Sequence, residues 1–290
     1  MPVPEVGGRL LVCATPIGNL GDVTLRVLDA LRGADVIAAE DTRVTRKLLA
    51  RYDITTPLER CDEHSVARVA PVLVQRVLDG ETVAFVSDAG TPGVSDPGAR
   101  LLAEAVRAGA RVEALPGASA LLAALVASGL PMQRFYFGGF LSRKAGERRR
   151  ELEALSSLDA TLVFFESPRR TAATLAALAE TLPGRDAALA RELTKLHEEV
   201  VRAPVAELAE QVARREQLKG EVVLLVGPPR KSARPTVEDP DVATRARARV
   251  EELLGEGVSR SAAAKQAAKE LGVPKSQLYA LAHEKPPAKA

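Results

Sequence analysis

The chain has 290 residues, of which 46% are hydrophobic, so it is long and apolar enough for two globular domains and an appendage. Its net charge is only +2, but residues 230–290 carry twelve basic against eight acidic side chains, and a mildly basic tail is a weak indication of an anionic partner. No apolar run approaches the roughly 20 residues of a membrane helix, and the first eight residues lack a signal-peptide pattern, so we expect a cytoplasmic protein without a membrane partner.

Short β-branched apolar runs alternate with helical patterns in the first part of the chain. Such alternation is typical of βαβ units, and it predicts an α/β domain with a mostly parallel sheet over residues 1–120. The predicted strands span residues 10–14, 36–39, 83–86 and 112–115. The predicted helices span residues 23–31, 45–51, 71–78 and 99–108.

The same alternation resumes after Gly129-Leu130-Pro131, and we place the domain boundary in the helix or turn around residues 118–130. A second α/β domain is therefore expected over residues 121–229. Its predicted strands span residues 135–140, 162–165, 187–190 and 222–226, and its predicted helices span residues 147–155, 170–182 and 205–217.

A linker rich in Pro and charge, residues 228–241, introduces a third region, so residues 230–290 are expected to form a linker and a helical tail. Helical spacing resumes at residues 242–254. Further on, Ala268 precedes Gly272 by four residues and Leu278 follows by six. This is the spacing of a helix-turn-helix, with a small residue where the helices touch and Gly at the turn. The other interpretation is an Ala-rich helical hairpin that packs on the body.

Every predicted strand ends in polar residues, Gly or Pro, and ligands of open α/β sheets bind beyond the carboxyl ends of the strands. We expect the strand ends of the two domains to line a cleft between the domains. The chain lacks the GxGxxG fingerprint after its first strand, a Walker phosphate loop and a GxSxG elbow, so dinucleotide, nucleoside triphosphate and serine hydrolase sites are unsupported. The three histidines and the two cysteines, Cys13 and Cys61, have no ligand spacing, so we expect no metal and two reduced packing cysteines.

Five segments at these strand ends resemble the tetrapyrrole methylase superfamily, and more narrowly its ribosomal RNA branch. The segments are Thr-Pro-Ile-Gly-Asn-Leu-Gly-Asp at residues 15–22, Glu-Asp-Thr-Arg at 40–43, Ser-Asp-Ala-Gly-Thr-Pro-Gly at 87–93, Pro-Gly-Ala-Ser at 116–119 and Arg-Glu-Leu-Thr-Lys at 191–195. The resemblance covers about residues 9–227, and the helical tail is similar to a C-terminal extension of the same branch.

The resemblance implies a two-domain α/β homodimer that binds S-adenosylmethionine in the cleft between the domains. It implies methyl transfer to the ribose 2′-oxygen of a cytidine in the decoding region of 16S rRNA, with the RNA in the small ribosomal subunit. A second hypothesis is a methyltransferase that acts on a tetrapyrrole or another small molecule, because the fold is shared. A third is an RNA-binding module that has lost catalysis. The Glu-Asp-Thr-Arg loop and the basic stretch at residues 143–150 favour RNA.

Positions in these motifs imply which residues surround the cofactor. The turn from Asp88 to Gly90 is expected to present backbone groups and a carboxylate to the polar end of the cofactor, and Phe165 is expected to enclose the adenine side. Asp88 could instead be a turn residue that caps its own loop. The full implied set is Pro16, Asp88, Ala89, Gly90, Ser119, Ala120, Phe165, Ala190, Arg191, Gly220 and Glu221.

Methyl transfer to a hydroxyl requires in-line alignment, which can supply roughly 7–11 kcal/mol, and it benefits from a base or an assisting hydrogen bond. The candidate residues are Glu40, Asp41, Glu166, Glu192, Lys195 and His64. We favour Asp41, Arg43, Lys195 and Glu192 as the catalytic residues. Glu40 and Asp41 could instead cap the following helix, His64 could be structural or contact RNA, and positioning alone could suffice.

RNA binding requires positive charge and stacking surface. We expect the aromatic residues at 135–140 to lie in the core of a buried strand and not on an RNA-facing surface. The basic run that follows them is a candidate for RNA contact. Two further arginines after the strand at 162–165 could reach phosphates. The predicted RNA-binding residues are Arg143, Lys144, Arg148, Arg149, Arg169 and Arg170. The tail either binds RNA or braces the fold.

Overall fold

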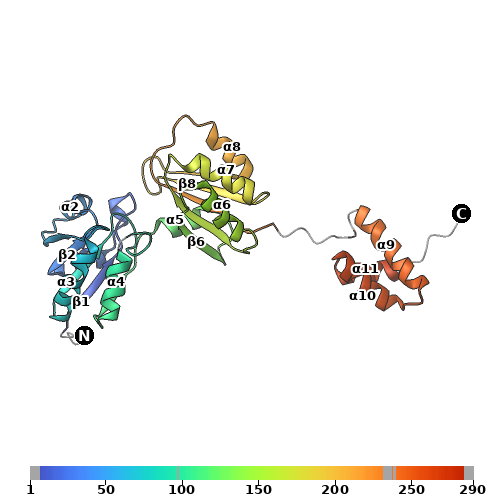
Figure 1. Ribbon diagram of the computed structural model, residues 1–290, viewed down its shortest axis with the longest axis horizontal. Coiled ribbons are helices and arrows are strands. Elements are labelled where there is room, and N and C mark those ends of the chain that lie inside the picture. Colours follow the sequence, from blue (N-terminus) through green and yellow to red (C-terminus); the bar gives the residue numbers. More distant parts are fainter. Residues whose placement is uncertain (1–6, 97, 231–236, 238–239, 284–290) are drawn as a thin grey trace. The chain divides into compact units, whose positions relative to one another are not determined.

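A computed structural model describes residues 7–96, 98–230, 237 and 240–283 (Figure 1). The chain divides into two compact units, Met1–Pro229 and Arg230–Ala290. The predicted linker at residues 228–241 lies mostly outside the described residues. The first unit contains two five-stranded sheets, and the fold is of the α/β class that the alternating pattern predicts.

The first sheet is entirely parallel, with the strand order β3-β2-β4-β1-β5. Because every strand runs in the same direction, all five carboxyl ends meet at one edge of the sheet. The strands are β1 (Arg9–Cys13), β2 (Val36–Ala39), β3 (Leu58–Arg60), β4 (Thr82–Val86) and β5 (Val112–Leu115). The helices are α1 (Leu25–Gly33), α2 (Thr42–Arg51), α3 (Val66–Leu78) and α4 (Gly98–Arg107), with a 3₁₀ turn η1 (Leu20–Asp22) after β1.

Helices cover both faces of this sheet, because successive strand residues point to opposite sides. Val83 and Phe85 pack with α3 and α4, whereas Ala84 and Val86 pack with α1 and α2. The predicted strands of this half are confirmed, and β3 is an addition at the sheet edge. The helix predicted from residue 71 begins at Val66 instead, because apolar residues on one face continue through the turn before Pro71, which the helix accommodates in its interior.

The second sheet has the order β6-β7-β10-β8-β9 and is mixed. Only β6 and β7 are parallel, and the other three pairs are antiparallel, so the mostly parallel arrangement holds for the first sheet alone. The strands are β6 (Phe135–Phe140), β7 (Thr161–Glu166), β8 (Asp186–Arg191), β9 (Glu199–Pro204) and β10 (Val222–Val226). The helices are α5 (Ala120–Ser128), α6 (Ala145–Ala154), α7 (Thr171–Thr181) and α8 (Val205–Ala213).

The two faces of this sheet also carry separate cores. Leu162, Phe164 and Leu224 pack under α6, α7 and α8, while Val163 and Val223 pack under α5 on the other face. The expectation that the aromatic cluster is core is wrong for three of its members. Phe135, Tyr136 and Phe140 are exposed, because β6 is an edge strand, and only Phe137 is partly buried against the core.

The cysteines are free and buried, as predicted. Burial raises the pKa of Cys13 to about 12 and that of Cys61 to about 11. The thiolate is the reactive form, so neither side chain should react with a thiol reagent at pH 8 in the native protein. Two equivalents of label should be incorporated after unfolding in guanidinium chloride. Labelling of the native protein at the rate of free cysteine would contradict this.

The second unit consists of α9 (Pro240–Gly255), α10 (Arg260–Leu271) and α11 (Lys275–His283), which confirms the predicted helices. Gly272 ends α10 in the left-handed conformation, with a φ of 67°. Leu278 is fully buried, and it packs with Ala263, Ala267 and Ala268 in a core built from this unit's own residues. Among the described residues of the chain, none of the helices combines the length and the hydropathy that crossing a bilayer requires.

Candidate active site

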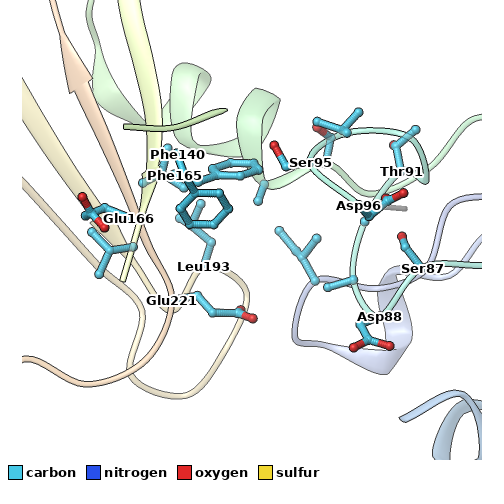
Figure 2. Close-up of a pocket in the computed structure, with 18 of the residues that line it drawn as sticks. Ser87, Asp88, Thr91, Ser95, Asp96, Phe140, Phe165, Glu166, Leu193 and Glu221 are labelled. Atoms are coloured by element: carbon cyan, nitrogen blue, oxygen red, sulfur yellow. The ribbon is translucent and has the colours of Figure 1, made fainter. Parts of the chain in front are cut away.

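A pocket of about 440 Å³ lies where the strand ends of the two sheets meet, in the first unit. Its first wall comes from the loops that follow β1, β2, β4 and β5, and its second wall comes from the ends of β6, β7 and β8 and the start of β10. Figure 2 shows Phe140 and Phe165 on one side, and Ser87, Thr91 and Asp96 on the other. The volume is in the range of small-molecule sites.

Nine of the eleven predicted cofactor residues line this pocket. They are Asp88, Ala89, Gly90, Ser119, Ala120, Phe165, Ala190, Gly220 and Glu221. Pro16 is buried beside the lining residue Ile17, and Arg191 pairs with Glu199 at 3.0 Å instead. The backbone N–H of Gly90 donates to Thr15 and its C=O accepts from Thr15, so the Gly90 N–H is not available to a ligand.

The lining suits an organic cation with an aromatic part. Its described residues include five carboxylates, from Glu40, Asp88, Asp96, Glu166 and Glu221, and no basic side chain. Glu166 and Glu221 pair with Arg170 and Lys195 behind the wall, so the charge offered to a ligand comes mainly from Glu40, Asp88 and Asp96. The hydroxyl of Ser87 is buried in the wall and has no hydrogen-bond partner among the described residues. S-adenosylmethionine carries a sulfonium, an ammonium and a carboxylate group, so it is a cation overall, and it carries hydroxyls that could partner Ser87. The residues present therefore fit this cofactor.

The loops after β2 and β4 are held together by two reciprocal hydrogen bonds. The Asp88 amide donates to Glu40 Oε2 at 3.2 Å, and the Asp41 amide donates to Asp88 Oδ1 at 2.9 Å. Asp88 therefore caps the neighbouring loop and not its own. Burial raises the pKa of both Glu40 and Asp88, against the lowering effect of these hydrogen bonds. Two carboxyl groups with a raised proton affinity are thus fixed at the pocket wall.

Asp41 is the N-cap of α2, as the capping interpretation predicts. Its carboxylate accepts the Arg43 amide at 2.8 Å and binds the Arg43 guanidinium, with 2.6 Å between Oδ2 and Nη2. These bonds hold the pKa of Asp41 far below its usual range. Asp41 and Arg43 lie outside the pocket. They line a second cavity of about 640 Å³ with Thr42, Arg60, Asp62, Glu63 and His64, and Glu40 lines both cavities.

Lys195 and Glu192 form a charged cluster beside the second wall of the pocket. Lys195 Nζ lies 2.8 Å from Glu192 Oε1 and 2.9 Å from Glu221 Oε2, and Glu221 lines the pocket. Burial alone would lower the pKa of Lys195, but its hydrogen bonds to the two carboxylates raise it overall. Lys195 therefore remains an ammonium group, and its chemistry at neutral pH is electrostatic.

The predicted RNA-binding residues follow β6 and β7. Arg143 and Arg169 are exposed and have no hydrogen bond or ion pair among the described residues. Arg170 instead donates to the Leu141 carbonyl at 2.7 Å and lies 3.3 Å from Glu166, so it fastens the loop after β6 to the end of β7. Two of the others have local ion pairs, since Lys144 pairs with Glu147 and Arg149 pairs with Glu153 and Glu180. The Arg148 Nε is buried and has no hydrogen-bond partner among the described residues.

Several lining residues are not among the residues predicted from the motifs. Ser87 and Thr91 lie in the segment at residues 87–93 that the motifs identified, so the signal was present there, whereas Asp96 lies three residues beyond that segment. Leu193 lies in the segment at residues 191–195 that carries the resemblance, whereas Phe140 had no such signal, because an apolar residue at a strand end gives no sequence indication of which way it points.

Comparison with known proteins agrees with this geometry. Residues 9–209 match the family described as Tetrapyrrole (Corrin/Porphyrin) Methylases. That span is more than half of the chain and includes most of the pocket, so the chain belongs to the tetrapyrrole methylase family.

Two relatives that match over nearly the whole chain carry a more specific name than the family. A Mesorhizobium japonicum protein named ribosomal RNA small subunit methyltransferase I is 46% identical, with 96% of this chain and 92% of the relative covered. A Bacillus subtilis protein of the same name is 41% identical, with coverages of 96% and 95%. The Thermus thermophilus uroporphyrin-III C-methyltransferase, solved as a complex with S-adenosylhomocysteine, shares the fold at 20% identity and a TM-score of 0.55, with coverages of 76% and 97%.

Proposed function

We propose that this protein transfers a methyl group from S-adenosylmethionine to the 2′-oxygen of a cytidine ribose in the decoding region of 16S rRNA. The observation that carries the cofactor assignment is the pocket, whose described lining combines aromatic and aliphatic side chains with five carboxylates and no basic residue. The names of the sequence relatives support ribosomal RNA as the acceptor. We further propose that the protein works in the cytoplasm.

The bound cofactor would supply an electrophilic methyl group on a sulfonium sulfur. Phe165 and Ala190 would contact the adenine, and the apolar surface would exclude water there. Carboxylates of the first wall, Asp88 among them, would face the cationic end, where they stabilise positive charge. Lys195, held by Glu192 and Glu221, would position the loop after β8 and contribute a fixed charge beside the pocket.

RNA contact would involve the basic residues after β6 and β7. Arg143 and Arg169 have the strongest support, because their exposed guanidinium groups have no partner among the described residues and can bind phosphates. Lys144, Arg148 and Arg149 would add positive charge near them. Arg170 would act through the loop that it fastens, since its guanidinium already bonds to backbone carbonyls.

A homodimer is proposed because one segment of the second half exposes many apolar side chains. Leu122 and Val126 project from α5, Met132 follows, and Phe135 and Tyr136 lie on the edge strand β6. Contiguous exposed apolar residues and an open strand edge are typical of protein interfaces.

Val126→Asp should therefore convert the protein from a dimer to a monomer, because a carboxylate would be buried in an apolar contact. Light scattering coupled to gel filtration measures this as a halving of the mass. Val106→Asp is the matched control, since Val106 is as exposed as Val126, 66% against 69%, but lies on α4. A wild-type protein that is already monomeric at micromolar concentration would overturn the proposed dimer.

The competing function, methylation of a tetrapyrrole, is tested by offering both acceptors. Purified protein with labelled S-adenosylmethionine should label small ribosomal subunits that lack their own modification, and it should not label uroporphyrinogen III. Labelling of the tetrapyrrole alone would favour a tetrapyrrole methyltransferase over an RNA methyltransferase. Retained cofactor and RNA binding with label in neither acceptor would favour a binding module without catalysis.

A further inference from the structure

Glu40 stands at the junction of two cavities. It lines the pocket between the sheets, and it also lines the second cavity formed by residues that follow β2 and β3. No other lining residue is common to the two sets. A side chain at such a junction can contact molecules bound on both sides, which is the position that a group acting between a methyl donor and an acceptor needs.

The carboxylate of Glu40 has one anchored oxygen and one that is free. Oε2 accepts the Asp88 amide at 3.2 Å, whereas no hydrogen bond reaches Oε1 from any described residue. Asp88 is engaged to the same extent, through Oδ1 alone, but it lines only the pocket between the sheets. Three other carboxylates of the region are more fully engaged. Asp41 is bound by the Arg43 guanidinium, Glu166 accepts from Thr174 and Ser167, and Asp96 accepts from two backbone amides.

The negative charges around Glu40 raise its affinity for a proton, which suits a proton acceptor. Carboxylates of Asp88 and Asp96 approach it from the loop after β4, and Asp41 lies next to it at the start of α2. Burial raises the pKa of Glu40, and these three charges raise it further. The remaining charged groups of the second cavity are Arg43, Arg60, Asp62, Glu63 and His64. Arg43 and Arg60 pair with Asp41 and Asp62, respectively.

The second cavity has features that suit a nucleotide. The side chains of Arg43 and Arg60 are 83% and 69% exposed, so each guanidinium keeps donors that can reach a phosphate. The polar floor contains carboxylates that can accept hydrogen bonds from ribose hydroxyls or an exocyclic amine. The cavity opens beside the cofactor pocket at Glu40.

We propose that the second cavity holds the acceptor nucleotide and that Glu40 is a catalytic residue, whose Oε1 accepts the proton of the ribose hydroxyl. This assignment rests on the proposed function. In the step, the bond from the hydroxyl oxygen to the methyl carbon forms as the bond from carbon to sulfur breaks. Sulfur keeps the electron pair, and the hydroxyl proton passes to Glu40 and then to solvent.

Glu40→Gln in the full-length protein separates this role from a structural one. Glutamine can still accept the Asp88 amide through its carbonyl oxygen, but it cannot take a proton. Because a general base contributes about 10²- to 10⁴-fold, kcat should fall at least 100-fold. The dissociation constant for the RNA should stay within about threefold, and the loss of S-adenosylmethionine affinity, measured by calorimetry, should be far smaller than the loss of kcat. Glu104→Gln on α4, which lies in neither cavity, should behave as wild type.

The pH dependence provides the second readout. In the wild type, kcat should decrease as the pH falls through the pKa of Glu40, because the protonated carboxyl cannot accept a proton. This limb should be absent from Glu40→Gln. A variant with near-normal kcat and the same acid limb would overturn the role of Glu40 while leaving the proposed function intact. A wild-type protein that methylates no RNA would overturn both.

Discussion

Glu166→Ala should lower the free energy of unfolding by about 2–4 kcal/mol, because it removes the acceptor from a buried polar cluster. The Glu166 side chain is almost fully buried at the end of β7. It accepts the Thr174 hydroxyl at 2.6 Å and the Ser167 amide at 2.7 Å, and it lies 3.3 Å from the Arg170 guanidinium. In the variant, the Thr174 hydroxyl, the Ser167 amide and the Arg170 guanidinium would lose this acceptor. Water would not replace the carboxylate fully at this buried position.

Equilibrium unfolding in urea measures this change in stability. The matched control is Glu180→Ala on the same helix, α7, whose exposed carboxylate pairs with Arg149. Because exposed ion pairs contribute little, the control should change stability by less than about 0.5 kcal/mol. Equal stabilities of the two variants would mean that the Glu166 cluster does not hold the loop after β7 in place.

Phe165→Ala should weaken S-adenosylmethionine binding about 10- to 100-fold, which corresponds to roughly 1.4–2.7 kcal/mol. Phe165 lines the pocket, and edge contacts with Phe137 at 4.9 Å and Phe140 at 5.8 Å between ring centroids fix its orientation. A fixed aromatic ring contributes apolar area and a preferred stacking geometry to an adenine.

Calorimetry on the folded variant gives the affinity directly. Phe165→Leu should fall between the wild type and Phe165→Ala, because it keeps apolar volume without the ring. Leu158→Ala, a substitution at a partly exposed residue outside the pocket, should bind like the wild type. Unchanged affinity in Phe165→Ala would place the adenine elsewhere.

The position of the site could be predicted from the sequence because the first sheet is parallel. Motifs that follow β1, β2, β4 and β5 are far apart in the chain, yet parallel strands bring their carboxyl ends to one edge. The predicted residues Asp88, Gly90 and Ser119 therefore lie around one pocket. In the second sheet, the antiparallel β10 contributes its start and not its end, and residues 220–221 were found only through the family resemblance.

Two of the edge strands, β3 and β9, could not be predicted from periodicity. β3 has three residues and none of them is buried, and β9 is partly exposed along its length and ends at Pro204. Such strands lack the apolar run that identifies a buried strand. For β6 the prediction was wrong in the opposite direction. The hydrophobicity of its aromatic residues indicates burial, but its place at the sheet edge leaves Phe135 and Phe140 exposed.

Which acidic residue can act in catalysis also depends on the tertiary structure. Glu40 and Asp41 are neighbours in a motif, and the sequence alone favoured Asp41. The structure separates them, since Asp41 is bound by Arg43 outside the pocket, whereas Glu40 reaches both cavities. Hydrogen-bond partners that come from a loop 48 residues away, as with Asp88, have no local signal.

The most direct test of the proposed function is the chemical position of the methyl group on the RNA. Small ribosomal subunits that lack their own modification would be incubated with the full-length protein and labelled S-adenosylmethionine, and the RNA would be digested and its nucleosides identified by mass spectrometry. We expect 2′-O-methylcytidine from one site in the decoding region of 16S rRNA. A methyl group on a base, or no labelled nucleoside with cofactor binding intact, would contradict it.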